Sequence, residues 1–159
     1  MTFKTADLCD DHGTLVQVAL PGMKNFGGNS RFSGPLVTID ARGDFSRVRE
    51  QVTSTGNGRV LVVDNQGSMD CALLGDLLAA AAISNGWSGI VINGCIRDSA
   101  DIAAMAIGVK ALATIPRKGA RNEQGDVDVE VEFCGIRFHP GDYLYSDEDG
   151  IITSPKALL

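Results

Sequence analysis

The sequence predicts a mixed α/β fold built on a central strand–helix–strand unit with antiparallel hairpins on its flank. Two strands of the buried type, residues 59–64 and 89–93, enclose an alanine- and leucine-rich segment at 72–84. Later, valines alternate with acidic residues over 127–133, which is typical of a half-exposed strand. A chain of 159 residues without repeats or a linker is expected to form one domain over 1–159.

The central unit is expected to be parallel. Residues 59–64 are rich in β-branched side chains and end in a polar turn at 65–68. The helix expected at 72–84 contains no proline, and Asn85-Gly86 follows it as at a left-handed C-cap. A crossover helix between consecutive strands implies right-handed parallel pairing. Both strands should therefore be buried.

Four elements are expected before this unit. They are a short helix, a strand, an amphipathic helix and a turn with positive φ, at residues 5–12, 35–40, 44–52 and 56–58. We expect Thr5 or Asp7 to cap the first helix. The loop at 25–31 is expected to be a turn rather than a phosphate cradle. It lacks the Lys-Ser/Thr ending of a P-loop, and no G-x-G-x-x-G follows a strand, so NAD or ATP is not expected.

One helix and five strands are expected after the unit. Their ranges are 100–107 for the helix and 109–115, 126–133, 136–138, 143–145 and 151–153 for the strands. Ser99 is expected to cap the helix. The cations Arg117 and Lys118 at the end of one strand favour a solvated loop over a partner for an anionic substrate.

Composition excludes several classes of function. A formal charge of −6 and a pI near 4.8 argue against direct nucleic-acid binding, which needs a basic surface. No leader and no bilayer-length apolar span are recognised, so we expect no membrane association and a cytoplasmic location. The four scattered cysteines form no CxxC pair, which predicts reduced thiols, and Cys95 is assigned no catalytic role.

The residues that follow the central strands carry the chemistry. Open parallel sheets bind ligands beyond the carboxyl ends of their strands. The segment 94–98 ends there in Arg97, suited to a carboxylate, and Asp98, suited to a hard divalent ion. If the helix begins near Gly75, its free N–H groups form an anion site and Asp76 returns beside Asp98.

These motifs resemble the RraA-like family, named after the regulator of ribonuclease activity A, which also contains metal-dependent 4-hydroxy-4-methyl-2-oxoglutarate aldolases. The likeness covers nearly the whole chain, with motifs at residues 5–10, 25–28, 58–64, 94–98 and 149–152. It implies a single-domain swivelling β/β/α architecture and a ring-shaped homotrimer.

The resemblance also implies roles for individual residues. Twenty residues separate Asp76 from the Arg97-Asp98 pair, and this spacing marks the enzymatic branch of the family. Asp98 would hold Mg²⁺ or Mn²⁺, and Asp76 would hold water near the metal. Arg97 and the backbone amides of Gly75, Asp76, Leu77 and Leu78 would bind a pyruvoyl group. Asp101 is either a helix-start acid or part of an Arg-Asp-x2-Asp extension.

The implied reaction is cleavage of 4-hydroxy-4-methyl-2-oxoglutarate to two pyruvates and decarboxylation of oxaloacetate, through a metal-stabilised enolate. Longer family enzymes use an additional acidic residue, so a water held by Asp76 is the candidate base here. Because decarboxylation needs no hydroxyl proton removed, we expect this activity to be retained more readily than aldol cleavage. No lysine lies within 59–101, which favours metal over amine catalysis. The alternative is a regulator that inhibits ribonuclease E by docking on it, as the family's namesake does.

Overall fold

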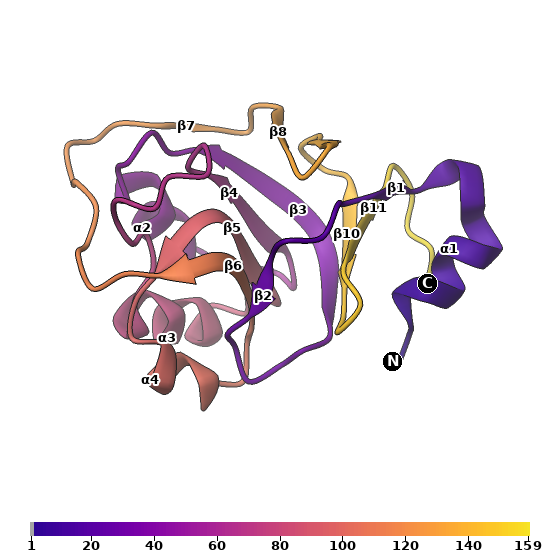
Figure 1. The fold of residues 1–159 in the computed structure, drawn as a ribbon, viewed down its shortest axis with the longest axis horizontal. Helices are drawn as coiled ribbons and strands as arrows, with labels where there is room; N and C mark the ends of the chain where they lie inside the picture. Colours follow the sequence, from indigo (N-terminus) through magenta and orange to yellow (C-terminus); the bar gives the residue numbers. More distant parts are fainter. Residues whose placement is uncertain (1) are drawn as a thin grey trace.

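Four parallel strands form the centre of the sheet in the computed structural model, which describes residues 2–159 (Figure 1). They are β3 (Phe32–Asp40), β4 (Val60–Asp64), β5 (Gly89–Ile96) and β6 (Gly108–Thr114), paired in that order. Every residue of β4 is buried. Because both faces of this strand are covered, residues 60–63 are all apolar instead of alternating, and only Asp64 at its end is charged.

Antiparallel strands extend the sheet on both sides, in the order β1-β11-β10-β3-β4-β5-β6-β2, with β7 also paired to β3. Their bounds are β1 (Gln17–Val18), β2 (Lys24–Asn25), β7 (Asp126–Val127), β10 (Tyr143–Ser146) and β11 (Ile151–Ser154). A separate hairpin joins β8 (Val131–Phe133) to β9 (Ile136–Phe138). The predicted mixed sheet with flanking antiparallel hairpins is confirmed.

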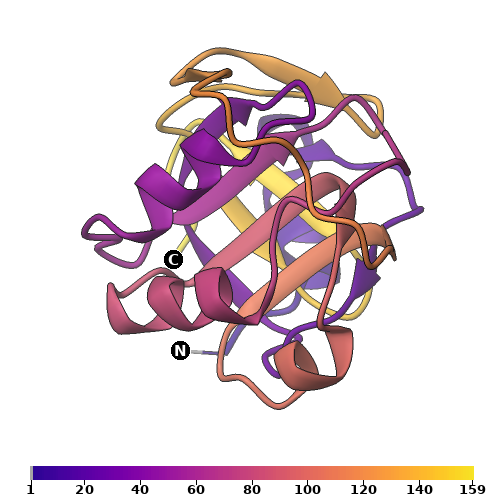
Figure 2. The same cartoon turned by 90° about the vertical axis from the view of Figure 1, so that its left-hand side faces the viewer.

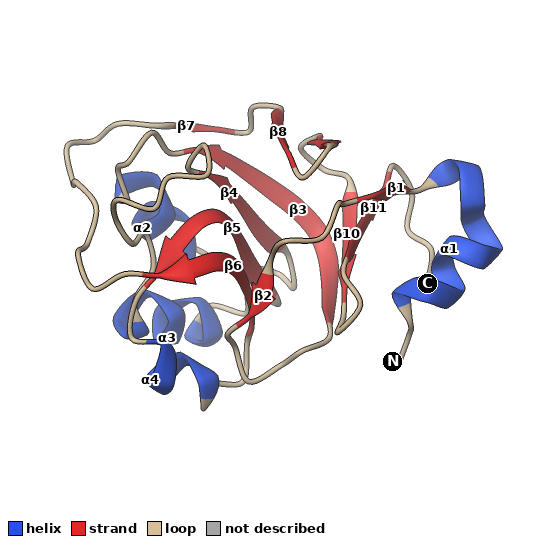
Figure 3. Cartoon of the chain, viewed as in Figure 1, coloured by secondary structure: helices blue, strands red, loops and turns tan. Residues whose placement is uncertain are grey.

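Three helices cover one face of the parallel strands: α2 (Ser46–Val52), α3 (Asp76–Ser84) and α4 (Ser99–Ala103). Figure 2 looks onto these helices with the strands behind them, and Figure 3 shows α1 (Thr5–His12) apart at the other end, beside β10 and β11. A 3₁₀ turn, Gly13–Leu15, follows α1. Within residues 2–159, no helix is both long and apolar enough to cross a bilayer.

The central strand contributes side chains to two separate cores. Leu61 and Val63 pack with the three helices, whereas Val60 and Val62 point to the opposite face, against the β8–β9 hairpin and β10–β11. This period of two follows from the pleat. A helix layer, the parallel strands and a second β layer therefore stack as β/β/α, the architecture that the resemblance implied.

Two boundaries of the central unit differ from the prediction. The helix expected at 72–84 begins only at Asp76, because Ala72 forms bridges to both Cys95 and Lys118. The second strand continues to Ile96, past a register shift after Ile92, so residues 94–96 belong to the sheet. Gly86 adopts φ +79° at the end of the helix, as predicted.

Three further predictions were wrong in detail. Neither Thr5 nor Asp7 caps α1, which has the predicted bounds but follows Lys4 without a side-chain cap. The helix expected at 100–107 ends at Ala103 and Ser99 is its first residue rather than its cap. The strand expected at 126–133 breaks because Asp128 adopts φ +59°, a left-handed conformation that interrupts a ladder.

Candidate active site

A short non-helical segment, 72–75, positions the candidate site. On one side, Arg97 N–H donates a 2.9 Å hydrogen bond to Leu74 O. On the other side, Ala72 N–H donates a 2.7 Å bond to Arg117 O. The segment therefore fills the space between the end of β5 and the loop after β6, and it delivers the chain into α3. Residues from three distant parts of the sequence meet at this edge.

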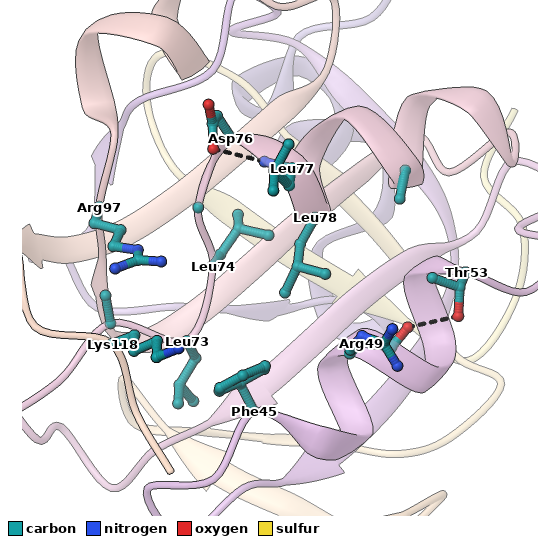
Figure 4. Close-up of a pocket in the computed structure, with 13 residues that line it drawn as sticks. Phe45, Arg49, Thr53, Leu73, Leu74, Asp76, Leu77, Leu78, Arg97 and Lys118 are labelled. Carbon is teal, nitrogen blue, oxygen red and sulfur yellow. Dashed lines mark hydrogen bonds between the residues drawn. The ribbon is translucent and has the colours of Figure 1, made fainter. Parts of the chain in front are cut away.

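A pocket of about 380 Å³ opens where these parts meet (Figure 4). Its lining includes three cations, Arg49, Arg97 and Lys118, together with apolar side chains such as Phe45 and Leu74. Figure 4 shows Arg97 and Lys118 on one side of the pocket and Arg49 on the other. The pocket thus offers positive charge at its edges and an apolar surface between them.

Asp76 and Asp98, predicted to lie together, are in direct contact. Asp76 N–H donates a 3.0 Å hydrogen bond to Asp98 Oδ2. That hydrogen bond, with smaller contributions from the Asp76 side chain and the Arg97 charge, holds the pKa of the Asp98 carboxyl below its usual value although burial opposes it. Asp98 is therefore a carboxylate at neutral pH. It is not a lining residue of the pocket, whereas Asp76 and Arg97 are.

The backbone at Asp98 is left-handed, with φ 57° and ψ 40°. This conformation costs about 1–2 kcal/mol for most residues, and aspartate is among the few that adopt it regularly. It turns the chain sharply from β5 into α4. The turn presents the Asp98 carboxylate to the first residue of α3.

Gly75 allows the approach of this carboxylate. A Cβ placed on Gly75 would lie 2.7 Å from Asp98 Oδ2 and 3.3 Å from Arg97 Nε. The backbone of Gly75 is extended, at φ −131°, so any residue could adopt it. The requirement for glycine is therefore one of space at the site.

The predicted amide site at the start of α3 is partly occupied by the protein's own carboxylates. The N–H of Asp76 binds Asp98, and the N–H of Leu77 binds Asp76 Oδ1 at 2.8 Å. Figure 4 shows the Asp76 carboxylate folded back onto its own helix. The helix start accepts carboxylate oxygens, as its dipole favours. The amides of Gly75 and Leu78 have no hydrogen-bond partner within residues 2–159, so they are the two open to a ligand without rearrangement.

The donor set at Asp98 fits a hard divalent cation. Its Oδ1 accepts no hydrogen bond from residues 2–159, and Asp76 adds a second carboxylate nearby. The described chain contains no group of three or more His, Cys, Asp or Glu side chains arranged to hold a metal. Mg²⁺ commonly binds through one or two carboxylates and keeps several waters, whereas structural zinc requires four protein ligands. The residues present therefore suit Mg²⁺ or Mn²⁺ and not structural zinc.

Two side chains weighed from the sequence lie outside the pocket lining. Asp101 is exposed in the first turn of α4. Cys95 is buried, and its Sγ contacts Met69 Sδ at 3.4 Å. All four cysteines, Cys95 included, are free thiols, as predicted.

Sequence reasoning missed Lys118 as a pocket residue. It treated Arg117 and Lys118 alike and favoured a solvated loop, but only Lys118 lines the pocket. The signal was weak because the bridge from Ala72 to Lys118 joins residues 46 positions apart. Residues 59–101 contain no lysine, but Lys118 brings an amine to the pocket from outside that stretch, so the absence of a lysine there does not exclude amine catalysis.

Comparison with known proteins gives a consistent family. Residues 5–153 match the model of the RraA-like family, described as Aldolase/RraA. A protein of Laribacter hongkongensis is 52% identical over 159 residues, the full length of both chains. One from Pseudomonas fluorescens is 51% identical over 98% of this chain and 96% of its own. Both carry the provisional name 4-hydroxy-4-methyl-2-oxoglutarate aldolase.

Solved structures share the fold but carry other names. A Geobacillus kaustophilus protein, titled an S-adenosylmethionine:2-dimethylmenaquinone methyltransferase, is 47% identical with a TM-score of 0.96, over 98% of this chain and 97% of its own. The RNA-processing inhibitor RraA of Thermus thermophilis is 37% identical with a TM-score of 0.96, over 100% and 96%. Names within this group thus span three activities, and the geometry of the site must discriminate between them.

Proposed function

Because this chain belongs to the RraA-like family, we propose that it is a divalent-metal-dependent carbon–carbon lyase acting on small 2-oxo acids. Its proposed reactions are cleavage of 4-hydroxy-4-methyl-2-oxoglutarate to two pyruvates and decarboxylation of oxaloacetate to pyruvate and CO₂. The observation that carries this proposal is the contact between Asp76 and Asp98 beside the Arg97 pocket. The aldolase names of full-length relatives at about 50% identity support it.

Both proposed reactions break the C3–C4 bond of the substrate. In 4-hydroxy-4-methyl-2-oxoglutarate, the C3–C4 bond breaks, the 4-hydroxyl loses its proton, and C4 becomes the carbonyl carbon of one pyruvate. The electron pair stays on the other fragment, which gains a proton at C3 and becomes the second pyruvate. In oxaloacetate the C3–C4 bond also breaks, but CO₂ leaves and no hydroxyl proton is removed.

Arg97 would bind the carboxylate of the 2-oxo acid end. Its guanidinium faces the pocket, and a planar fork of N–H donors matches a carboxylate with two parallel hydrogen bonds. The amides of Gly75 and Leu78 would add two neutral donors from the start of α3. Charge that develops on the substrate's oxygen atoms would then be met by donors already in place, which is the main source of electrostatic catalysis.

Asp98 would hold the cation, with Asp76 binding a water molecule near it. When bound, Mg²⁺ or Mn²⁺ supplies a Lewis acid that withdraws electrons from the 2-oxo group. The water at Asp76 is the proposed acceptor of the 4-hydroxyl proton. Since oxaloacetate needs no such acceptor, its decarboxylation depends less on Asp76 than aldol cleavage does.

A second candidate function is inhibition of ribonuclease E by direct binding. The likeness to the Thermus RNA-processing inhibitor favours it, and a homotrimer would suit either role. Direct RNA binding is not part of this proposal, because the chain's net charge is −6. We do not propose methyl transfer, because the sequence contains no G-x-G-x-x-G cofactor loop after a strand.

The test is a coupled pyruvate assay with both substrates, each with Mg²⁺ and with excess EDTA. The proposal predicts pyruvate formation that appears with Mg²⁺ and disappears with EDTA. Binding to ribonuclease E that is unaffected by EDTA, without pyruvate formation from either acid, would favour the regulator instead. Turnover that persists fully in EDTA would contradict the metal requirement.

A further inference from the structure

Lys118 differs from its neighbour Arg117 although both follow the same strand. Gly119 N–H donates a 2.9 Å hydrogen bond to Ala72 O, and Ala72 N–H binds Arg117 O, so the backbone on both sides of Lys118 is held. Lys118 then lines the pocket next to Arg97, and Arg117 does not. The sheet-like pairing therefore fixes the backbone of this lysine, whose side chain is exposed at the edge of the pocket.

Neither Arg97 nor Lys118 forms a salt bridge within the described chain, although the Arg97 charge acts on the nearby Asp98 carboxyl at longer range. No carboxylate lies within 4.0 Å of either cation among residues 2–159. Some arginines elsewhere are paired, such as Arg42 with Asp126 at 2.9 Å and Arg47 with Glu50 at 2.9 Å, so what sets Arg97 and Lys118 apart is that both line one pocket. Two unpaired cations on one side of a pocket suit a ligand with two negative charges.

The pocket is also larger than a three-carbon acid requires. At about 380 Å³ it falls within the range of roughly 300–1,000 Å³ that holds drug-sized ligands. Leu74 and Phe45 form an apolar surface beyond the two cations (Figure 4). Such a surface suits a methyl or methylene group and offers no hydrogen bond to a hydroxylated chain.

We propose that Lys118 binds the second carboxylate of a 2-oxo dicarboxylate whose first carboxylate binds Arg97, while the apolar surface contacts the carbons between or beside them. This inference rests on the proposed lyase function and names its substrate class. A monocarboxylic 2-oxo acid would then bind Arg97 but leave Lys118 without a carboxylate partner. Lys118 acts in specificity, and it takes no part in bond breaking.

Arg49 and a covalent role for Lys118 are the competing assignments. Arg49 lies on the far side of the pocket, past Phe45 in Figure 4, so it would bind the second carboxylate only of a longer substrate. A Schiff base would instead join the Lys118 amine to the 2-oxo carbon, release water, and leave an adduct that borohydride reduces to a stable amine. Each alternative predicts a result different from that of the proposal.

The test compares two stable ligands of equal chain length, 2-oxoglutarate and 2-oxopentanoate, as competitive inhibitors of oxaloacetate decarboxylation and by calorimetry with Mg²⁺. Lys118→Ala is expected to weaken 2-oxoglutarate binding about tenfold and to change 2-oxopentanoate binding less than about twofold. Lys118→Arg should retain most of the affinity. Arg117→Ala removes the same charge from the adjacent position, and both ligands should bind it as they bind the wild type.

The outcomes separate this inference from the function it rests on. Equal binding of 2-oxoglutarate by the wild type and Lys118→Ala, in an active enzyme, overturns the role of Lys118 alone. If Arg49→Ala instead weakened the binding of 2-oxoglutarate but not of 2-oxopentanoate, the second carboxylate would have to bind at Arg49, on the far side of the pocket. A borohydride-trapped adduct on Lys118 would show covalent catalysis and also overturn the proposal. Absence of turnover with every 2-oxo acid would contradict the lyase function itself.

Discussion

At the scale of single residues, the site depends on how closely Asp98 approaches the first turn of α3. Its left-handed backbone turns the carboxylate toward Asp76, and the hydrogen bond from Asp76 N–H fixes one oxygen and leaves the other free. The same bond lowers the pKa of Asp98, which favours the charged carboxylate that a metal ion would need. A site this small tolerates little change in side-chain volume.

Gly75→Ala tests that dependence. The new Cβ would force the Asp98 carboxylate and the Arg97 side chain to move, because both lie within 3.3 Å of it. We expect metal-dependent turnover to fall about tenfold, because the Asp98 carboxylate and Arg97 would leave the positions in which they meet the ligand. The free energy of unfolding should change by less than about 1 kcal/mol, because the backbone is extended and Asp98 is exposed.

Gly13→Ala is a suitable control for this prediction. A Cβ on Gly13 would meet no atom within 4 Å, and Gly13 does not line the pocket; its φ of 8° is unfavourable for alanine, so this variant also shows what backbone strain away from the site does to turnover. Its turnover should equal that of the wild type. If Gly75→Ala also retained full turnover, the packing of Gly75 against Asp98 would be irrelevant to the reaction.

The sequence predicted part of the site and missed part of it. Asp76, Arg97 and Asp98 were predicted to lie together because the spacing of a strand–helix–strand unit returns its two exits to the same edge, and they do lie together; their roles stay a prediction. Lys118 was not, because its place depends on a bridge to Ala72 that local patterns do not encode. The hydrogen bond from Leu77 N–H to Asp76 Oδ1 was not predicted either, because it depends on the side-chain rotamer of Asp76, which no sequence pattern specifies.

At the scale of elements, α1 is attached to the sheet through one buried acid. Thr5 N–H and Thr5 Oγ1 each donate a 2.7 Å hydrogen bond to the Asp147 carboxylate, in the turn between β10 and β11. Burial raises the pKa of Asp147, but the hydrogen bonds from Thr5 and from the backbone of the turn outweigh it and leave the pKa below its usual value. The contact should therefore contribute to stability only while Asp147 is charged.

Thr5→Val is expected to reduce the free energy of unfolding by about 1–3 kcal/mol at pH 7, because Asp147 Oδ1 loses the Thr5 hydroxyl and keeps only the Asp149 N–H as a donor. A lowered folded-state pKa adds stability above the unfolded pKa of about 3.9, and that stability is lost as the pH falls through the folded pKa. The difference between variant and wild type should thus narrow below about pH 4. Urea unfolding from pH 7 to pH 3 measures both effects.

Thr53→Val provides the comparison for that experiment. Thr53 Oγ1 also donates a 2.7 Å bond, but at an exposed position and to the carbonyl oxygen of Arg49. Its loss should cost less than about 0.5 kcal/mol, with no change between pH 7 and pH 3. Equal, pH-independent effects in the two variants would show that the Asp147 charge does not secure α1.

Element types were easier to predict than element ends. Strands β4 and β5 were identified because their apolar runs are bounded by polar or glycine-containing turns. The start of α3 was placed too early because Ala72 and Leu73 have high helix propensity, whereas Ala72 is held by pairing on both sides. Tertiary hydrogen bonds overrode the local preference there.

At the scale of the whole molecule, several large apolar side chains remain exposed on the single chain. Leu77 is 80% exposed at the start of α3, and Leu20 is 64% exposed. The proposed homotrimer would cover some of this surface. Light scattering coupled to size-exclusion chromatography should then give three times the 16.7 kDa of the chain. A mass of one chain at micromolar concentration would rule out a stable trimer.

The central claim is that Asp98, beside Arg97, supports metal-dependent formation of pyruvate. The measurement that tests it most directly is oxaloacetate turnover by Asp98→Asn at saturating Mg²⁺, with circular dichroism and unfolding to verify the fold. Asparagine tolerates the left-handed backbone and keeps an oxygen for the Asp76 amide, so the fold should be preserved while the charged ligand is lost. We predict that turnover falls at least about 100-fold. Turnover equal to that of the wild type would contradict the account.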